Sequence, residues 1–329
     1  MVMRQVSVCD VPFNLVKGNE RTYDWLILAI GAESRCCHVA TQLFNGGRCT
    51  ATQILVLRYP DVNKCEAGRV LRRLTDLCGN KQRITEVVLE SDSHEEIYNM
   101  LNSMFRIDRK TDCSIIVDYS CMSRVWYSAL LYWFYLRYED CNHLSFYFLY
   151  AKGKYTEAMA SKDVTIREIR PVPGCGGVIS RQANTVAIFC LGFYGYMSLC
   201  VYDELEPNEI YTILTSEKPL RKYPIERQPG NKELMERAAN VIKVSVRSVE
   251  GAFRRMMDIA KYRQLKGDNV TIVPMGPKPH ILASILVALA NHDVCVMRVR
   301  HDEYTSNVAP AGEIVATGIR FVDINYESD

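Results

Sequence analysis

The chain has 329 residues, of which 48% are hydrophobic and 24% are charged. At about 100–200 residues per domain, this length predicts two domains, each with enough apolar surface for a core. The apolar content excludes an intrinsically disordered chain, and the ordinary usage of Gly and Pro excludes a collagen-like or coiled-coil rod. Forty Lys and Arg stand against 38 Asp and Glu, and the resulting net charge of +2 argues against a protein that coats nucleic acid by bulk charge.

The cysteines and the apolar segments indicate a cytoplasmic protein without a membrane span. The 13 cysteines are scattered singly except for Cys36 and Cys37, and the absence of a C-x-x-C motif disfavours a zinc ribbon or a thioredoxin-type site. We interpret them as reduced structural thiols. The first residues lack the charged head and long apolar core of a signal peptide. The most apolar segment, residues 125–135, is shorter than a membrane span of about 20 residues and predicts a buried helix.

Short apolar runs alternate with amphipathic stretches of helical length in the first part of the chain. Runs of almost continuous Ile, Leu and Val are typical of strands that are buried on both faces. The predicted strands are residues 25–30, 54–57, 86–89, 114–117 and 144–150, and the predicted helices are residues 36–44, 64–78, 93–105 and 124–138. This alternation predicts a mainly parallel sheet with helices on both faces.

A polar stretch rich in Pro and Gly, residues 152–183, interrupts the alternation. Turn residues at this density predict a connector, with one or two edge strands near residues 164–169. A further late strand is expected at residues 313–322.

After the connector, the order of elements in the first half recurs. Residues 186–192 correspond to residues 25–31, and residues 270–280 correspond to residues 114–124. We therefore predict an α/β fold of two tandem Rossmann-like halves, each a mainly parallel sheet flanked by helices. The first half is expected at residues 1–151 and the second at residues 184–329. The alternative is the generic similarity that any two βα units share.

The loops after the first and fourth strands of each half are the expected ligand-binding segments. In open parallel sheets, ligands bind beyond the carboxyl ends of the strands, at the point where the strand order switches. These loops are residues 31–35, 118–124, 192–196 and 275–280. If the two halves pack as a pseudo-dimer, all four loops can line one cleft.

Two of these loops suit a phosphate group. The turn at Gly276 follows a strand and precedes a helix, so backbone N–H groups and the helix dipole would favour an anion there. Lys278 adds a point charge, and His280 adds a donor that could protonate near neutral pH. At the equivalent place in the first half, hydroxyl groups and a guanidinium offer phosphate contacts. Those residues are Ser120, Ser123 and Arg124. The alternatives are that a serine only caps its helix and that the turn at Gly276 is an ordinary one.

Two carboxylates are candidates for catalysis. Glu33 follows a strand-end glycine and could accept hydrogen bonds from a ribose diol, with Ser34 and Arg35 beside it at the entrance of the site. Alternatively, Glu33 pairs with Arg35 or caps its helix. Asp118 ends a predicted strand and is a candidate acid or base, whereas its counterpart in the second half is Pro274.

The sequence predicts no organic cofactor and no metal site. The segment after Gly31 lacks the later glycines of the G-x-G-x-x-G fingerprint, and no Walker A motif is present, so NAD-dependent hydride transfer is not predicted. The six His form no H-x-x-x-H or H-E-x-x-H pair, and there is no G-x-S-x-G elbow.

Three clusters of basic residues are candidates for a nucleic-acid-binding surface. They are Arg69, Arg72 and Arg73; Arg247, Arg254, Arg255, Lys261 and Arg263; and Arg298, Arg300 and His301. Solvated faces are the favoured interpretation. A nucleic-acid groove would require that the clusters merge into one stripe with stacking aromatic side chains.

The strand, turn and helix at residues 270–290, with the run Met275-Gly276-Pro277-Lys278, resemble those of CARF domains. CARF domains are Rossmann-type sensors that accompany CRISPR systems and bind cyclic oligoadenylates, and two of them normally pair around a symmetric ligand. Pro277 and Pro279 depart from the Gly/Thr-rich turn of that family, and the first-half loop has no Lys. CARF proteins usually carry an effector domain, for which no long region remains here, so the resemblance implies an effector on another chain.

Our leading hypothesis is a nucleotide-binding module, with a cyclic oligonucleotide as one candidate ligand. Following the resemblance, it would be a sensor or partner subunit of a prokaryotic defence or regulatory system. The first alternative is an enzyme that cleaves or transfers at a glycosidic bond of a nucleotide or nucleoside, with Glu33 or Asp118 as nucleophile or base. The second is a non-catalytic structural subunit that binds a partner protein.

Overall fold

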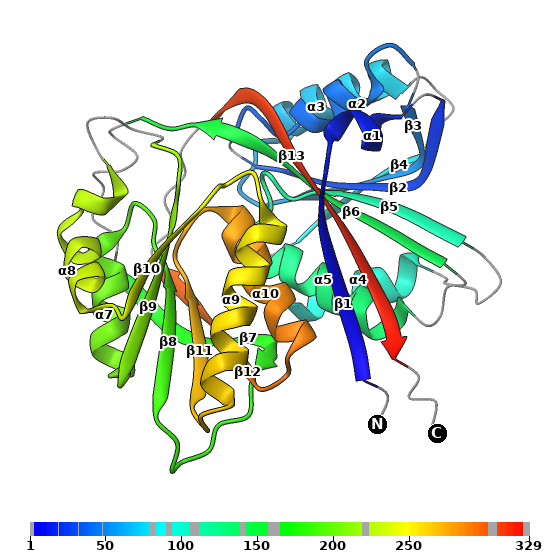
Figure 1. The fold of residues 1–329 in the computed structure, drawn as a ribbon. Coiled ribbons are helices and arrows are strands. Elements are labelled where there is room, and N and C mark those ends of the chain that lie inside the picture. Colours follow the sequence, from blue (N-terminus) through cyan, green and yellow to red (C-terminus); the bar gives the residue numbers. More distant parts are fainter. Residues whose placement is uncertain are drawn as a thin grey trace, which may run out of the picture. The chain divides into compact units, whose positions relative to one another are not determined.

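In the computed structural model the chain forms two β-sheets, each at the centre of its own unit (Figure 1). It describes residues 3–18, 20–31, 33–47, 49–78, 83–89, 94–105, 112–138, 143–156, 165–218, 224–301 and 308–324. Unit 1 comprises Met1–Lys154 and Thr305–Asp329, and unit 2 comprises Tyr155–Tyr304. Among the helices in these ranges, none is both long and apolar enough to cross a membrane.

Unit 1 is built on a seven-stranded sheet with the order β1-β13-β6-β5-β2-β3-β4. The strands are β1 (Met3–Val11), β2 (Arg21–Ile30), β3 (Cys49–Arg58), β4 (Arg83–Val88), β5 (Asp112–Asp118), β6 (His143–Lys154) and β13 (Ala309–Ile324). Strands β2 to β6 are parallel to their neighbours. Strand β13 runs antiparallel between β6 and β1, so the first and last strands of the chain lie side by side (Figure 1).

Five helices accompany this sheet in the ranges that the structure describes. They are α1 (Phe13–Lys17), α2 (His38–Phe44), α3 (Lys64–Cys78), α4 (His94–Met104) and α5 (Arg124–Arg137). Helix α2 packs on α3 and α4 packs on α5, and Figure 1 shows the two pairs on opposite faces of the sheet. Helix α5 is apolar on nearly all sides, and Trp126 and Phe134 are fully buried, as predicted for the segment 125–135.

Unit 2 is built on a six-stranded sheet with the order β10-β9-β8-β11-β12-β7. The strands are β7 (Ile166–Gly176), β8 (Thr185–Cys190), β9 (Glu209–Thr215), β10 (Asn240–Val244), β11 (Asn269–Pro274) and β12 (Val294–His301). The helices are α7 (Gly195–Leu205), α8 (Pro229–Arg237), α9 (Val249–Gln264) and α10 (Lys278–Ala290), with a short 3₁₀ turn, η2 (Ile225–Arg227). Only β7 is antiparallel to its neighbour in the part of this sheet that the structure describes.

The two sheets share one strand order. In each unit, the five parallel strands lie in the order third, second, first, fourth, fifth. The α/β class and the two Rossmann-like halves predicted from the sequence are therefore confirmed. The order switches between β2 and β5 in unit 1 and between β8 and β11 in unit 2, and ligands bind at this point in open α/β sheets.

Two segments correct the expected boundaries. The sequence placed residues 309–324 in the second half, but strand β13 pairs with β6 and β1 and belongs to unit 1. The expected connector contains the edge strand that was predicted near residues 164–169, but this strand, β7, extends to Gly176, pairs with β12 and makes the segment part of the unit 2 sheet. In each unit, the fifth parallel strand is therefore covered by an antiparallel strand from outside the five-strand core, because an uncovered edge would leave backbone groups unpaired.

Candidate functional site

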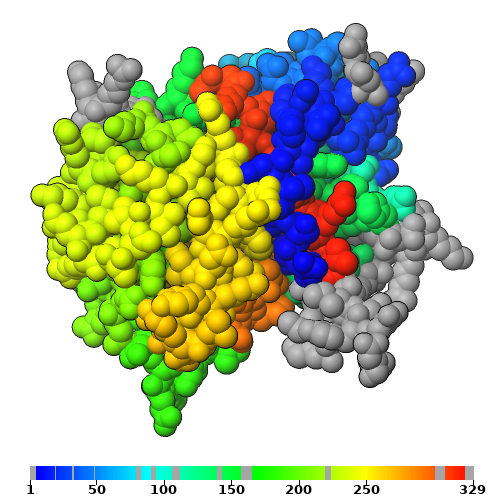
Figure 2. Space-filling model, in the orientation of Figure 1, coloured from blue at the N-terminus to red at the C-terminus, as the bar shows by residue number. Residues whose placement is uncertain are grey.

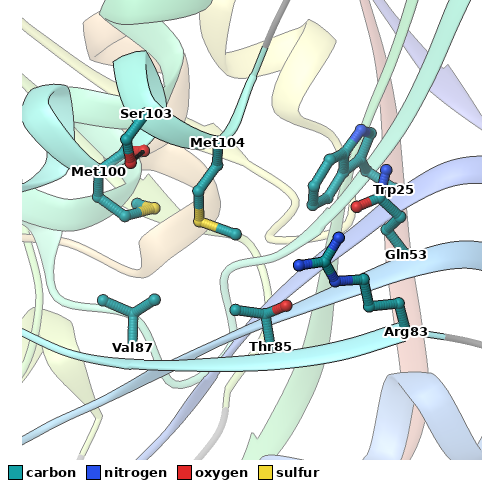
Figure 3. A pocket seen from close by; sticks show the side chains of 8 residues that line it. All are labelled: Trp25, Gln53, Arg83, Thr85, Val87, Met100, Ser103 and Met104. Atoms are coloured by element: carbon teal, nitrogen blue, oxygen red, sulfur yellow. Dashed lines mark hydrogen bonds between the residues drawn. The ribbon is translucent and has the colours of Figure 1, made fainter.

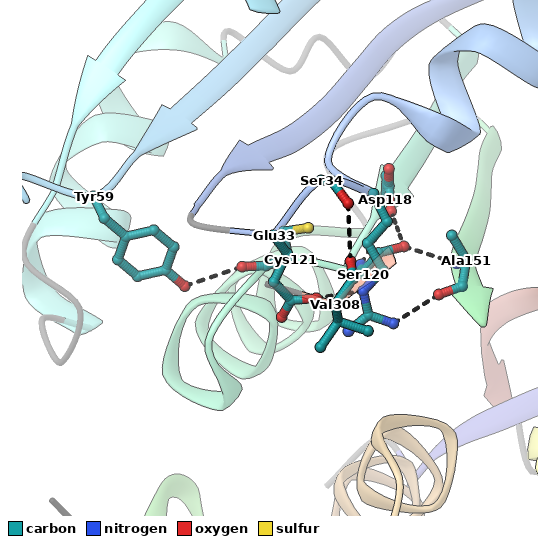
Figure 4. A network of polar contacts seen from close by, with 9 residues as sticks. Glu33, Ser34, Tyr59, Asp118, Ser120, Cys121, Ala151 and Val308 are labelled. Atoms are coloured by element: carbon teal, nitrogen blue, oxygen red, sulfur yellow. Dashed lines mark hydrogen bonds and ion pairs between the residues drawn. The ribbon is translucent and has the colours of Figure 1, made fainter. Parts of the chain in front are cut away.

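In unit 1, a buried acid and a buried serine tie the loop after β5 to β6 (Figure 4). The backbone N–H of Ser120 donates to Asp118 Oδ1 at 3.0 Å, and the Ser120 hydroxyl donates to the same oxygen. The hydroxyl oxygen also accepts from the backbone N–H of Ala151 at 2.7 Å. Asp118 is 2% exposed and Ser120 is fully buried. Both were predicted as site residues, and their observed role is to position the loop.

Arg35 is buried beside Glu33 instead of lining an open entrance. Its Nε donates to the Glu33 carboxylate, and its Nη1 donates to the carbonyl oxygen of Ala151 at 2.8 Å. The guanidinium carbon also lies 5.2 Å from the centre of the Tyr150 ring. The neighbouring Ser34 hydroxyl donates to the carbonyl oxygen of Val308 at 3.5 Å (Figure 4). The alternative that Glu33 pairs with Arg35 is the one that the structure shows.

Ser123 is the N-cap of α5, which is the capping alternative of the sequence analysis. Its hydroxyl oxygen accepts from the backbone N–H of Trp126 at 3.1 Å. The ring of Tyr59 stacks on Trp126 with 3.9 Å between centroids, and its hydroxyl donates to the carbonyl oxygen of Cys121 (Figure 4). Arg124 follows at the first position of the helix and is partly buried. The Ser123 hydroxyl therefore already accepts a hydrogen bond from the N-terminus of α5, where the sequence predicted a phosphate.

In unit 2, two glycines bring the loops at the switch point into contact. A Cβ atom on Gly192, just after β8, would lie 2.4 Å from the carbonyl oxygen of Met275. A Cβ atom on Gly276, just after β11, would lie 3.2 Å from the carbonyl oxygen of Leu191. The two backbones therefore approach more closely at Gly192 than any side chain would allow. This approach fixes the position at which α10 begins.

The start of α10 differs from that of α5. Its N-cap is Pro277, whose side chain cannot accept a hydrogen bond, and Lys278 is partly buried at the first helical position. Pro277 and Pro279 carry no backbone N–H, and the N–H groups of His280 and Ile281 donate to the carbonyl oxygen of Pro277 at 2.9 and 3.1 Å. An anion at this place would therefore meet mainly the positive end of the helix dipole and the charge of Lys278. The element that the sequence singled out for phosphate therefore lies at the switch point of the unit 2 sheet.

His280 is fully buried in the first turn of α10, and neither ring nitrogen has a hydrogen-bond partner among the residues that the structure describes. Burial lowers the pKa of His280 to about 4, while the backbone at Ser245 and Val244 and the carboxylate of Glu217 act in the opposite direction. The expectation that His280 protonates near neutral pH is therefore wrong, because the imidazole is sealed from water.

The sequence analysis missed Glu217, which follows the end of β9. Its carboxylate accepts from the hydroxyls of Ser245 and Thr215 and from the backbone N–H of Val246 at 2.9 Å. Partial burial would raise the pKa of Glu217, but these hydrogen bonds outweigh it and lower the pKa to about 2. A carboxylate therefore stays ionised at the carboxyl edge of the unit 2 sheet. The available signal was an acidic residue two positions after the end of a buried strand.

Asn231 in α8 was also missed. It is fully buried, and its Nδ2 donates to the carbonyl oxygen of Gly192 at 2.7 Å and to that of Ile225 at 3.0 Å. Its Oδ1 is buried without a partner in the described part of the chain. Asn231 thus holds the loop after β8 in place, but nothing in the sequence near α8 indicates this contact.

The basic clusters are largely solvated or paired with acids. Arg69, Arg72 and Arg73 are exposed on α3. Helix α9 runs along the surface in Figure 2, and its Arg254 pairs with Glu250. Arg263 pairs with Glu209 and Asp268, and Arg298 pairs with Glu168. This arrangement supports the solvated interpretation over a nucleic-acid groove.

Comparisons with known proteins leave the family open. No protein-family model and no curated protein matches the chain. Among solved structures, the chain is similar to an N-terminal ketoreductase from a macrolactin assembly line, with 9% sequence identity and a TM-score of 0.23. The similarity covers 89% of this chain and 73% of that chain. We draw nothing about function from so low a score, and the fold assignment stands on the strand order.

Proposed function

We propose that the chain binds a phosphate-bearing nucleotide at the carboxyl edge of the unit 2 sheet, between β8 and β11. The observation that carries the proposal is the contact between the loops at Gly192 and Gly276, where α10 begins with Lys278 in its first turn. A phosphate at this place would meet the positive end of the helix dipole and the lysine charge. Backbone N–H groups add little, because Pro277 and Pro279 have none and those of His280 and Ile281 donate to the carbonyl oxygen of Pro277.

We favour unit 2 over unit 1 because the polar groups at the unit 1 switch point already hydrogen-bond within the protein. In unit 1, Asp118 is bonded to Ser120, and Ser123 caps α5. In unit 2, α10 has no side-chain cap, and the buried Oδ1 of Asn231, whose Nδ2 donates to Gly192, lacks a partner among the described residues. Such groups are costly unless a water molecule or a ligand satisfies them.

A narrower form of the proposal names the ligand as a cyclic oligonucleotide. It rests on the resemblance of residues 270–290 to CARF domains. In this form the chain is a sensor in a prokaryotic defence or regulatory system, and the effector activity belongs to a partner protein.

Isothermal titration calorimetry with ATP, ADP-ribose and cyclic oligoadenylates tests the proposal. We expect saturable binding of at least one of these, weakened about 10-fold or more by Lys278→Ala, because a charge-assisted phosphate contact contributes about 1.5–3 kcal/mol. Lys261→Ala is the matched control, since it removes the same charge from an exposed position near the end of α9.

Absence of binding across the panel would contradict the proposal, as would equal losses in the two variants. Turnover of a bound nucleotide that Glu33→Gln abolishes would favour the enzyme alternative instead.

A further inference from the structure

A pocket of about 550 Å³ lies in unit 1, between α4 and the face of strands β2, β3 and β4. Its walls carry an aromatic ring, two thioethers and a guanidinium, as the close view in Figure 3 shows. It lies within the body of the strands, away from the loops at their carboxyl ends. A volume of this size is ordinary for a small-molecule site, which typically joins apolar walls to a few polar groups.

The register of three parallel strands builds the floor of the pocket. Trp25 of β2 lies opposite Gln53 of β3, and Gln53 lies opposite Arg83 of β4. Residues in register on neighbouring strands point to the same face, so these three side chains form one row. Thr85, two residues after Arg83, belongs to the same face and also lines the pocket.

The aromatic wall is held in place from behind. The ring of Trp25 packs on Phe105 with 4.2 Å between centroids, and Phe105 in turn packs on Trp133 and Phe134. Trp25 is 8% exposed, so it presents one small, fixed surface. The opposite wall consists of Met100 and Met104 of α4, one helical turn apart, whose flexible thioethers adapt to an aromatic partner.

Arg83 supplies a positive charge next to this apolar surface. Figure 3 shows its guanidinium extending toward Gln53 and Trp25. Arg58, on the neighbouring strand, pairs with Glu86 at 2.6 Å. In the part of the chain that the structure describes, Arg83 has no such ion pair and no hydrogen bond. Arg83 is exposed, so solvent accounts for its lack of a protein partner. Its guanidinium beside an aromatic ring and two thioethers nevertheless offers an anion with an apolar body both a charge and an apolar wall.

We propose that this pocket binds a small aromatic carboxylate. The carboxylate would accept two parallel hydrogen bonds from Arg83, the geometry that a guanidinium offers best. The ring would lie between Trp25 on one side and Met100 and Met104 on the other. This site is separate from the nucleotide site proposed for unit 2 and does not depend on it.

Calorimetric titration with 2-naphthoate, and with its neutral counterpart 2-naphthamide, tests the site. We expect saturable 1:1 binding of 2-naphthoate and at least 10-fold weaker binding of 2-naphthamide. Arg83→Gln should weaken 2-naphthoate binding at least 10-fold, whereas Arg72→Gln, the same change at an exposed position of α3, should leave it unchanged. Ser103→Phe, which fills the pocket from α4 and keeps Arg83, should also abolish binding.

Thermal unfolding of each variant verifies that it is folded, and Lys278→Ala should leave 2-naphthoate binding unchanged. Absence of saturable binding would overturn the proposal, as would equal affinity for the acid and the amide or equal losses in Arg83→Gln and Arg72→Gln. If ATP bound here and lost affinity with Arg83→Gln, the assignment to a carboxylate would be overturned in favour of a phosphate.

Discussion

His280 shows how a single residue can oppose folding at acidic pH. The imidazole is fully buried without a described hydrogen-bond partner, so the folded chain keeps it neutral. Burial lowers its pKa from 6.5 to about 4. The unfolded chain therefore takes up a proton at a higher pH than the folded chain does. The contribution to stability is complete above pH 6.5 and is lost progressively as the pH falls from 6.5 toward 4.

Replacement of this residue makes the effect measurable. Between pH 7 and pH 5, the titration of His280 should cost about 2 kcal/mol of unfolding free energy, and His280→Leu should abolish that part of the loss. Urea unfolding of both proteins at the two pH values provides the measurement. Glu217 does not contribute to the change between pH 7 and pH 5. Its hydrogen bonds lower its pKa from 4.5 to about 2, so its stabilising contribution is lost only below about pH 4.5. An unchanged pH dependence in the variant would show that His280 does not titrate as described.

At the scale of one element, Ser123 connects the loop after β5 to the beginning of α5. Its hydroxyl oxygen accepts from the backbone N–H of Trp126. We expect Ser123→Ala to lower the unfolding free energy by about 1 kcal/mol, while Ser123→Thr, which keeps an acceptor oxygen, should retain most of the stability. Chemical denaturation measures both variants. Equal stability of the alanine variant and the original protein would show that the cap contributes nothing.

Elements with strong local signals were predictable, and elements that depend on distant partners were not. Strands β2, β3, β5 and β6 are continuous apolar runs, because helices cover both of their faces, and the sequence located all four. Strand β1 was missed, since its pairing partner β13 comes from the other end of the chain. For the candidate site, the start of α10 was found from the turn at Gly276. The pairing of Arg35 with Ala151 and the contacts of Glu217 required the tertiary structure.

At the scale of the whole molecule, the two units share a strand order but complete their sheets differently. Unit 2 covers its fifth strand, β12, with β7, which precedes the unit 2 core in the chain. Unit 1 covers its fifth strand, β6, with β13, which follows the whole of unit 2. The chain therefore leaves unit 1, forms unit 2 and returns. The local sequence pattern predicts a late strand but not the sheet that it joins. The sequence analysis therefore assigned all residues after 184 to the second half, including β13.

The return of β13 predicts which sheet responds to a change near the end of the chain. Ile319 is buried in β13, opposite Phe146 of β6. Ile319→Ala should cost about 2–5 kcal/mol and accelerate amide hydrogen exchange in β1 and β6, while exchange in β8 and β11 stays unchanged. Val296→Ala, in the fully buried part of β12, is the matched control and should affect the unit 2 sheet instead. If Ile319→Ala accelerated exchange in β8 and β11, the last strand would belong to the second sheet, and the division into two units would have to be redrawn.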